Sequence, residues 1–247
     1  MGYTTQAIEA NHYYLVAAQF KDVGQSAETI TLDKLIKLSN VPATTFADAT
    51  KGLGVQIQVL KATGSGYTTY YYVSNPKNAS GVTVEGPAWV STLGKIVTVD
   101  FDLGTGFWFK AATVDTDATA TFAGEVKSDN FQKTVDLREG YNMIANTYPV
   151  AINGVNVTVG GITPTTFADA TKGLGIQIQV LKASGSGYTT YYYVSNPKDA
   201  SGAVVTGPAW VTTLGKMPTT AIAGVGEGFW LKAPSSGTLT FDINPNE

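Results

Sequence analysis

Apolar and polar residues alternate most regularly in the segment VQIQVLK at residues 55–61, where valine and isoleucine are separated by glutamines. A period of two is typical of a β-strand with one face buried against a core. The segment is followed by ATGSG and then by YTTYYYV, a second run rich in β-forming residues. The glycines between the two runs allow the positive φ angles of a tight turn, so the pattern predicts a β-hairpin.

The register of this hairpin decides which tyrosines face the core. A four-residue loop at 63–66 places Ile57 opposite Tyr72 on the core side and Gln58 opposite Tyr71 on the outer side. A loop that is one residue longer or shorter would exchange the two faces. Consecutive aromatic residues in a strand cannot all face inward, so part of the tyrosine cluster is expected on the surface.

The same hairpin occurs twice, because residues 44–95 align with residues 165–216 at a constant offset of 121. Of the 52 aligned positions, 7 differ and 45 are identical. GTGFWFKA at 104–111 and GEGFWLKA at 226–233 continue the alignment at an offset of 122, whereas the flanking segments have diverged. The duplication indicates two domains. The uneven divergence is explained either by one surface that both copies retain or by local gene conversion.

Other β-rich runs are short and are separated by glycine, proline, asparagine and aspartate at a spacing typical of β-sandwiches. One segment, Thr31–Leu38, has the apolar spacing of a helix and lies in an insertion that the first copy alone contains. The sequence therefore predicts an all-β protein made of two tandem, duplicated antiparallel β-sandwich domains with at most one short helix. The expected domains are residues 1–128 and 129–247.

The composition favours a folded protein and argues against several partners. Hydrophobic residues make up 43% of the 247 residues and charged residues only 14%, and the net charge is -3. Arg138 is the single arginine, so there is no arginine-rich surface for phosphates and we expect no nucleic-acid partner. No apolar run is long enough for a membrane span, and the first residues lack the basic and apolar regions of a signal peptide.

Residues for catalysis or metal binding are scarce. The chain has no cysteine and one histidine, His12, which argues against a zinc site and against histidine-assisted nucleophilic catalysis. Asp48 and Asp169 are the carboxylate pair that the repeated block retains, and a turn role is favoured for them over acid–base chemistry on a glycan. The sequence DTD at 115–117 lacks the spacing of a recognised calcium loop. We therefore predict no catalytic residues, no metal site and no cofactor.

Aromatic residues stand out in both copies. We predict a binding or assembly surface that includes one tyrosine and two tryptophans of each copy. Such residues would stack on sugar rings, fill a contact with a neighbouring subunit, or cover an interface between the domains of one chain. The six residues are Tyr71, Trp89, Trp108, Tyr192, Trp210 and Trp230.

Three segments together resemble a known group of proteins. GYNMIANTYP at 140–149, IQVLKASGSGYTTYYYV at 178–194 and GEGFWLKAPSSGTLTF at 226–241 resemble the units of secreted tandem-repeat β proteins of Verrucomicrobia and related bacteria. In that group a GYN(L/M)(I/V)AN strand and a GxGFW(L/F)K segment mark each unit. The first copy departs from the pattern at HYYLVAAQF, residues 12–20. The resemblance implies an extracellular or cell-surface protein, exported with a signal peptide that this sequence does not contain, and it supplies no catalytic residues.

The leading hypothesis is a non-enzymatic extracellular structural subunit that self-assembles into a fibre or a surface layer. Two similar domains offer the same contact twice, and a contact that does not close on itself generates a polymer. The N-terminal segment Thr4–Val16 is the expected site of strand exchange, since open sandwich edges pair with other strands. The alternative is a surface protein that binds polysaccharide through two linked aromatic sites.

Overall fold

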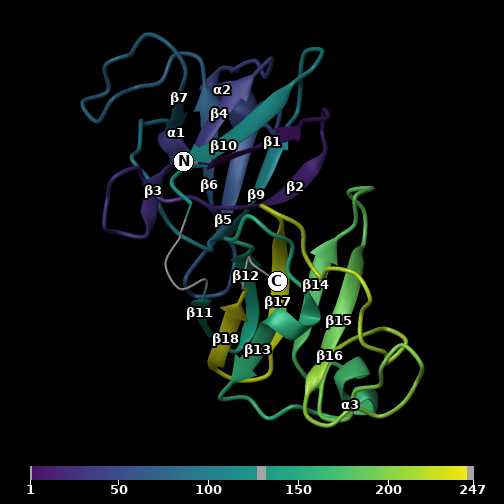
Figure 1. The fold of residues 1–247 in the computed structure, drawn as a ribbon. Helices are drawn as coiled ribbons and strands as arrows, with labels where there is room; N and C mark the ends of the chain where they lie inside the picture. Colours follow the sequence, from purple (N-terminus) through teal and green to yellow (C-terminus); the bar gives the residue numbers. More distant parts are fainter. Residues whose placement is uncertain (1, 127–131, 244–247) are drawn as a thin grey trace. The chain divides into compact units, whose positions relative to one another are not determined.

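The computed structural model describes residues 2–126 and 132–243 (Figure 1). In these ranges the strands form five antiparallel sheets accompanied by three short α-helices, so the predicted all-β class is confirmed. The chain divides into two compact units, Met1–Val126 and Lys127–Glu247. The boundary predicted at residues 128 and 129 lies outside the described residues. Of the helices in the described part of the chain, none is long and apolar enough to cross a membrane.

The first unit contains a five-stranded sheet, a three-stranded sheet and a two-stranded ribbon. Their strand orders are β2-β9-β5-β6-β7, β1-β10-β4 and β3-β8. The strands are β1 Gly2–Ala7, β2 Tyr13–Ala17, β3 Thr29–Thr31, β4 Ile36–Ser39, β5 Val55–Leu60, β6 Tyr67–Val73, β7 Ala88–Val90, β8 Asp100–Asp102, β9 Gly106–Ala111 and β10 Thr119–Gly124.

The second unit repeats the two larger sheets of the first. Their strand orders are β12-β17-β14-β15-β16 and β11-β18-β13, so each strand has a counterpart at the same place in the first unit. The strands are β11 Gln132–Leu137, β12 Gly140–Ala145, β13 Val157–Gly160, β14 Gln177–Leu181, β15 Tyr188–Val194, β16 Ala209–Thr212, β17 Gly228–Ala233 and β18 Gly237–Asp242.

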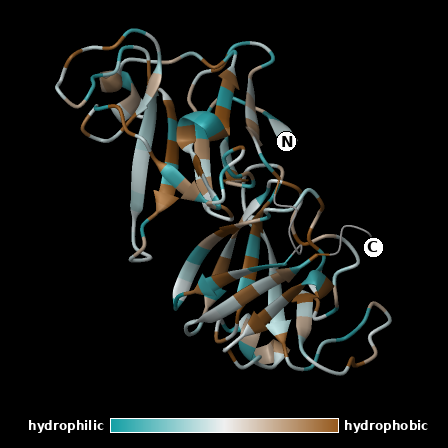
Figure 2. Ribbon diagram, turned by 60° about the vertical axis from the view of Figure 1, so that its left-hand side comes forward, coloured by the Kyte–Doolittle hydropathy of each residue, from teal (hydrophilic) through white to brown (hydrophobic). Residues whose placement is uncertain are grey.

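The core of each unit combines residues of its large and small sheets. In the first unit, Ile57, Phe107 and Phe109 of the five-stranded sheet belong to one buried cluster. Ala120 and Phe122 of the three-stranded sheet belong to the same cluster, and none of the five is more than 4% exposed. Burial of a large apolar side chain contributes about 1.5–3 kcal/mol, so this inner layer is the main stabilising feature. Brown segments along the strands of Figure 2 mark these apolar residues.

The sequence FADAT forms a short helix in both units, where the sequence pattern had predicted a turn. The helices are α2 (Phe46–Thr50) and α3 (Phe167–Thr171). The hydroxyl of Thr45 accepts a hydrogen bond from the Asp48 amide at 3.2 Å and donates one to the Asp48 carboxylate at 2.8 Å. The same two bonds recur at the start of α3. The threonine hydroxyl satisfies one free amide of the first turn, and the carboxylate holds that hydroxyl in place, which stabilises so short a helix.

The helix predicted at Thr31–Leu38 is shorter than expected. It covers Leu32–Leu35 as α1, and strand β4 begins directly at Ile36. Ile36 pairs with Phe122 of β10, so sheet pairing overrides the helical spacing of the second half of the segment. In the second unit a 3-10 helix, η1 at Gly154–Asn156, precedes the equivalent strand β13.

The hairpin register differs from the predicted one by two residues. Ile57 pairs with Tyr70 rather than with Tyr72, because the loop spans six residues, 61–66, instead of four. A shift of two residues preserves the alternation of side chains. Tyr70 and Tyr72 therefore still pack against the core, and Tyr71 lies on the outer face, as predicted.

Candidate functional site

Trp89 and Trp210 are core residues and are not surface stacking platforms, which corrects the prediction for both. Their exposed fractions are 4% and 1%. Each packs on a tyrosine of the neighbouring strand: the ring centroids of Tyr72 and Trp89 are 5.2 Å apart, and those of Tyr193 and Trp210 are also 5.2 Å apart. Both tryptophans are held inside because strands β7 and β16 direct these side chains to the same face as the inward tyrosines.

Tyr71 and Tyr192 lie on the opposite, outer face of the large sheets, and both are half-buried. The short helices cover them. The ring of Phe46 in α2 meets Tyr71 edge-on at 6.1 Å, and Phe167 in α3 meets Tyr192 at 5.9 Å. Each of these tyrosines therefore has only one part of its ring available to a ligand or a neighbouring subunit.

Trp108 lies on the same outer face, because its neighbours Phe107 and Phe109 both point into the core with no exposed surface. Its ring meets that of Tyr13 edge-on at 6.1 Å, and the ammonium group of Lys110 lies 5.1 Å above the Tyr13 ring. Trp108 is half-buried. The outer face thus holds a small aromatic and cationic group at strands β2 and β9.

The second unit has the same edge-on aromatic pair around Trp230, but the ammonium group of Lys232 donates to the Gly173 oxygen at 3.4 Å. The Trp230 ring meets Tyr141 edge-on at 5.9 Å, and Tyr141 pairs with Lys232 across the strands. Trp230 is 8% exposed, so it is buried where Trp108 is half-buried. The large sheets therefore bring Tyr71 with Trp108, and Tyr192 with Trp230, onto one outer face each. They separate Trp89 and Trp210 onto the inner faces.

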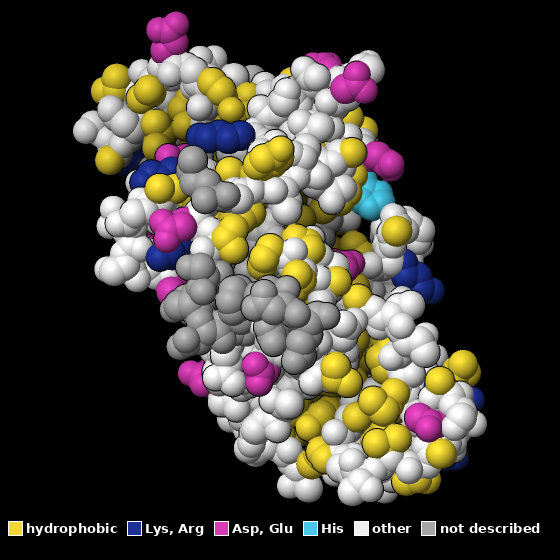
Figure 3. All heavy atoms as spheres, viewed as in Figure 1, with side chains coloured by type: hydrophobic (Ala, Val, Ile, Leu, Met, Phe, Trp, Pro, Cys, Tyr) yellow, Lys and Arg dark blue, Asp and Glu magenta, His cyan; other side chains and the backbone are white. Residues whose placement is uncertain are grey.

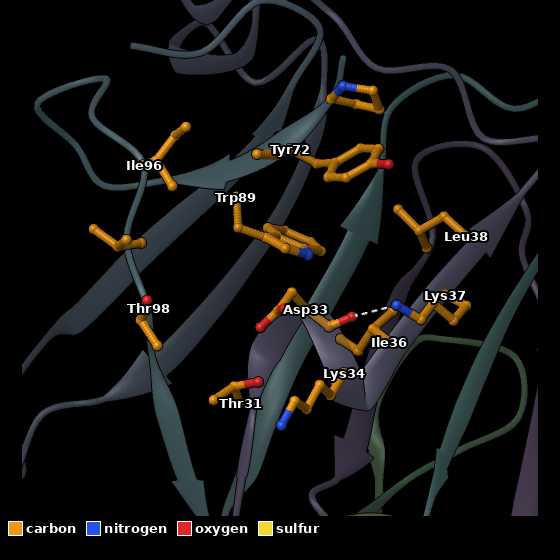
Figure 4. Close-up of a pocket in the computed structure, with 13 residues that line it drawn as sticks. Thr31, Asp33, Lys34, Ile36, Lys37, Leu38, Tyr72, Trp89, Ile96 and Thr98 are labelled. Carbon is orange, nitrogen blue, oxygen red and sulfur yellow. Dashed lines mark hydrogen bonds between the residues drawn. The ribbon is translucent and has the colours of Figure 1, made fainter. Parts of the chain in front are cut away.

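A pocket of about 580 Å³ lies in the first unit beside Trp89 (Figure 4). One wall comes from β4 and from α1, which stands where the second unit has η1, and the other comes from the tyrosine hairpin and the segment after β7. Tyr72, Trp89, Leu38 and Ile96 are among its apolar lining residues. Its volume falls within the range of small-ligand sites. The sequence pattern did not reveal it, because the insertion meets Trp89 only through the tertiary fold.

The charged groups of this pocket belong to α1 and β4. Lys34 forms an ion pair with Asp22, and this carboxylate raises the pKa of Lys34. The ammonium group of Lys37 donates to the backbone oxygen of Asp33 at 2.7 Å. Burial raises the pKa of the Tyr72 hydroxyl, whose side chain lines the pocket.

The residues considered for catalysis are not arranged as a reactive site. His12 lies 3.8 Å from Glu9 and its ring stacks near Tyr14 at 4.6 Å. Asp48 and Asp169 cap their helices, and hydrogen bonds from Thr166 and then Lys172 lower the pKa of Asp169. Among the described residues, no three histidine, aspartate or glutamate side chains gather as metal ligands. On the face shown in Figure 3, lysine and arginine side chains are few and scattered.

Comparison with protein-family models, with curated proteins and with solved structures found no match. The resemblance to secreted tandem-repeat proteins therefore stays a prediction.

Proposed function

We propose that the protein is a non-enzymatic structural subunit that self-assembles outside the cell. The observation that supports this is strand β1, Gly2–Ala7, at one edge of the small sheet of the first unit. The strand has no charged residue and no proline, and Tyr3 is 74% exposed. Natural proteins place charged residues and proline on sheet edges to prevent pairing with other chains, so an edge that lacks both is suited to pairing.

The other three edges of the two small sheets are protected. Strand β4 carries Lys37, and strand β11 carries Lys133 and Asp136. Strand β13, like β1, lacks charged residues and proline, but it has only four residues, and the indole nitrogen of Trp210 already donates to its Val157 oxygen at 2.9 Å. Within the described residues, β1 is therefore the open edge of the small sheets.

This proposal modifies the strand exchange expected for Thr4–Val16. In the structure this segment supplies strands β1 and β2, and both pair within their own unit. Donating it to another chain would remove one strand from each of two sheets. Pairing between the β1 edges of two copies leaves both folds intact. Removal of the whole segment would also remove part of the core, so the role of the β1 edge is tested with point substitutions.

Pairing of two β1 edges alone gives a closed dimer, so a polymer requires a second contact. The repeated turns after β7 and β16 offer one. Leu93 is 81% exposed and Leu214 is 82% exposed, and the glycine after each packs against Phe46 or Phe167. Each subunit thus presents the same exposed leucine twice, next to the same short helix, which is the repetition that a fibre or layer requires.

The test uses two matched threonines. Thr5 of β1 and Thr134 of β11 are both exposed, and each faces a threonine across its strand pair, at 3.4 Å and 3.0 Å. Thr5→Lys adds a charge to the open edge and is expected to shift the mass measured by light scattering toward the monomer. Thr134→Lys adds a charge to an edge that is already charged and is expected to leave assembly unchanged. Equal assembly of both variants and the wild type, seen by electron microscopy, would refute the role of β1.

Polysaccharide binding is the second candidate. The observation that favours it is the pocket beside Trp89 rather than an exposed stacking platform, because Trp89 and Trp210 are buried. Tyr71→Ala combined with Tyr192→Ala tests the outer face separately. If the wild type is retained on a column of immobilised polysaccharide and the double variant is not, binding lies on the outer face. If both are retained equally, binding on the outer face is excluded.

A further inference from the structure

The same tyrosine and tryptophan pair has different hydrogen bonding in the two units. In the second unit the indole nitrogen of Trp210 donates to the Val157 oxygen at 2.9 Å. In the first unit, neither the indole nitrogen of Trp89 nor the hydroxyl of Tyr72 has a hydrogen-bond partner among the described residues. Figure 4 shows both groups turned toward Leu38 of β4, the strand equivalent to β13. The indole N–H that the second unit satisfies internally therefore faces the pocket in the first unit.

The flanking segments explain the difference. In the second unit η1 contacts strand β16, Gly154 lies close to the side chains of Trp210, Pro218 and Ile222, and Trp210 is 1% exposed. In the first unit the insertion replaces η1 with α1, and Val97 stands where the second unit has Pro218. The pocket of about 580 Å³ lies between this insertion and the aromatic pair. The pocket therefore exists where the flank of the first unit differs from that of the second, and its aromatic wall, Tyr72 and Trp89, consists of residues that both units retain.

The inner part of the pocket suits a ring with an apolar face. The rings of Tyr72 and Trp89 are inclined at 51° and form one wall, and Leu38, Ile96 and Val97 complete the apolar lining. The indole N–H is a donor only, whereas the tyrosine hydroxyl both donates and accepts. A ligand that fills this space must therefore combine apolar C–H groups with oxygen atoms that accept hydrogen bonds.

The rim carries both signs of charge. The ammonium group of Lys34 is held by Asp22, and that of Lys37 is bonded only to a backbone oxygen. The carboxylate of Asp33 has no ion-pair partner among the described residues. A carboxylate accepts hydrogen bonds and an ammonium group donates them, so the rim suits ligand groups that both donate and accept. Hydroxyl groups have this property.

We propose that this pocket binds a single neutral pyranose ring of a saccharide, with its apolar face against the half-buried ring of Tyr72 and its hydroxyl groups bonded by Asp33, Lys37 and the indole N–H of Trp89. This inference deepens the second candidate function and is independent of assembly through β1. The second unit does not bind the ring, because η1 and the Val157 oxygen occupy the equivalent place.

The experiment records the indole N–H resonances of the ¹⁵N-labelled full chain during titration with methyl glucoside, methyl galactoside and methyl mannoside, each to about 50 mM. Trp89→Phe and Trp210→Phe assign the two resonances, and Trp210 is the internal control. We expect at least one glycoside to shift Trp89 and none to shift Trp210. Asp33→Ala, an exposed change outside the core, is expected to weaken binding about fivefold to tenfold.

Further arms separate the ligand classes. Glucuronate and benzoate replace the neutral glycosides in parallel titrations. A shift of Trp89 by either acid, with no shift by any neutral glycoside, would overturn the assignment to a neutral sugar. No shift by any compound would overturn the site itself. Repeating the titration on Thr5→Lys separates this result from the assembly proposal, since that variant is expected to bind equally well.

Discussion

The two units contain almost the same central block, yet they use it differently. Of 52 aligned residues 45 are identical, and the aromatic pairs Tyr72–Trp89 and Tyr193–Trp210 have the same ring separation of 5.2 Å. In the second unit this pair is sealed by η1 and β13. In the first unit it forms the wall of a pocket. The comparison teaches that the diverged flanks, rather than the retained block, decide whether the pair is a structural element or a binding surface.

The flanks of the second unit also contain a polar network that the first unit lacks. Asn146 stands where the first unit has Ala18, and its side-chain amide donates to the backbone oxygens of Val150 and Gly224 at 2.7 Å and 2.9 Å. Asn146 is fully buried. These bonds hold the segment after β12 in a compact conformation. The first unit has its longer insertion at the equivalent place. The second unit is thus the more self-contained form of the fold.

The largest test of this comparison removes each tryptophan of the pair. We expect Trp210→Ala to lower the free energy of unfolding of its unit by about 3–5 kcal/mol, since it leaves a cavity. It also leaves the Val157 oxygen unpaired. Trp89→Ala is expected to cost about 1–2 kcal/mol less, because Trp89 borders an existing pocket and breaks no hydrogen bond. Urea unfolding of the full chain, followed by hydrogen exchange of each unit, measures the two changes in the free energy of unfolding. Equal destabilisation by the two substitutions would contradict the difference between the units.

A second test exchanges the core residue at which the retained GFWxKA segments differ. Phe109 and Leu231 occupy equivalent positions and neither is exposed. Leu231→Phe overpacks the second core and is expected to cost about 1–3 kcal/mol. Phe109→Leu leaves a void in the first core and is expected to cost about 1–2 kcal/mol. Two neutral substitutions, measured by the same unfolding experiment, would show that the two cores are interchangeable and that the flanks do not shape them.

Much of the fold follows from local pattern. The alternation at residues 55–59 predicts β5, the glycines predict the hairpin, and the duplication predicts that the large sheet occurs twice. The register was wrong by two residues because loop length depends on turn geometry that the sequence GSG does not determine. The helices at FADAT were missed because a five-residue helix has no apolar periodicity, although the spacing of Thr45 and Asp48 carries a capping signal.

The candidate site was less predictable than the fold. Aromatic residues identified the right part of the chain, but the side-chain direction of Trp89 depends on the register of β7, a strand of only three residues. The pocket depends on two segments far apart in the sequence. Nothing in the pattern of Thr31–Leu38 indicates that it will face Trp89, because that contact is set by the pairing of β4 with β10. Long-range pairing is the information that a single sequence lacks.

A third test concerns a feature that both units share. Thr45→Ala and Thr166→Ala remove the capping hydroxyls of α2 and α3, and each is expected to destabilise its unit by about 1 kcal/mol. The two losses should be equal, since the hydrogen-bond distances at the two caps are the same, 2.8 Å and 3.2 Å. Thr→Ser at either site retains the oxygen and is the control. A clear inequality would show that the flanks alter even the most similar part of the two units.

The smallest expected effect is a pH dependence confined to the second unit. Burial raises the pKa of Glu227, while the Gly224 amide, which donates to its carboxylate at 2.7 Å, opposes this. The first unit has Thr105 at the equivalent place. Its backbone oxygen accepts from the amide of Ala18, the residue after β2, as the backbone oxygen of Glu227 accepts from the amide of Asn146 after β12. A carboxyl whose pKa is higher in the folded state than in the unfolded state binds its proton more tightly when folded.

Its contribution to stability is therefore fully present below pH 4.5, the ordinary value, and is lost as the pH rises through the raised pKa. We expect the urea midpoint of the second unit to fall slightly between pH 4.5 and pH 7 relative to that of Glu227→Gln, whose amide oxygen still accepts from Gly224. Exposed acids with lowered pKa, such as Asp199, are already ionised across this range and do not contribute to the difference. Parallel plots of the urea midpoint against pH for the wild type and for Glu227→Gln would mean that the Glu227 carboxyl is solvated in the folded state. In that case the polar network around Asn146 would not be the closed element that distinguishes the second unit from the first.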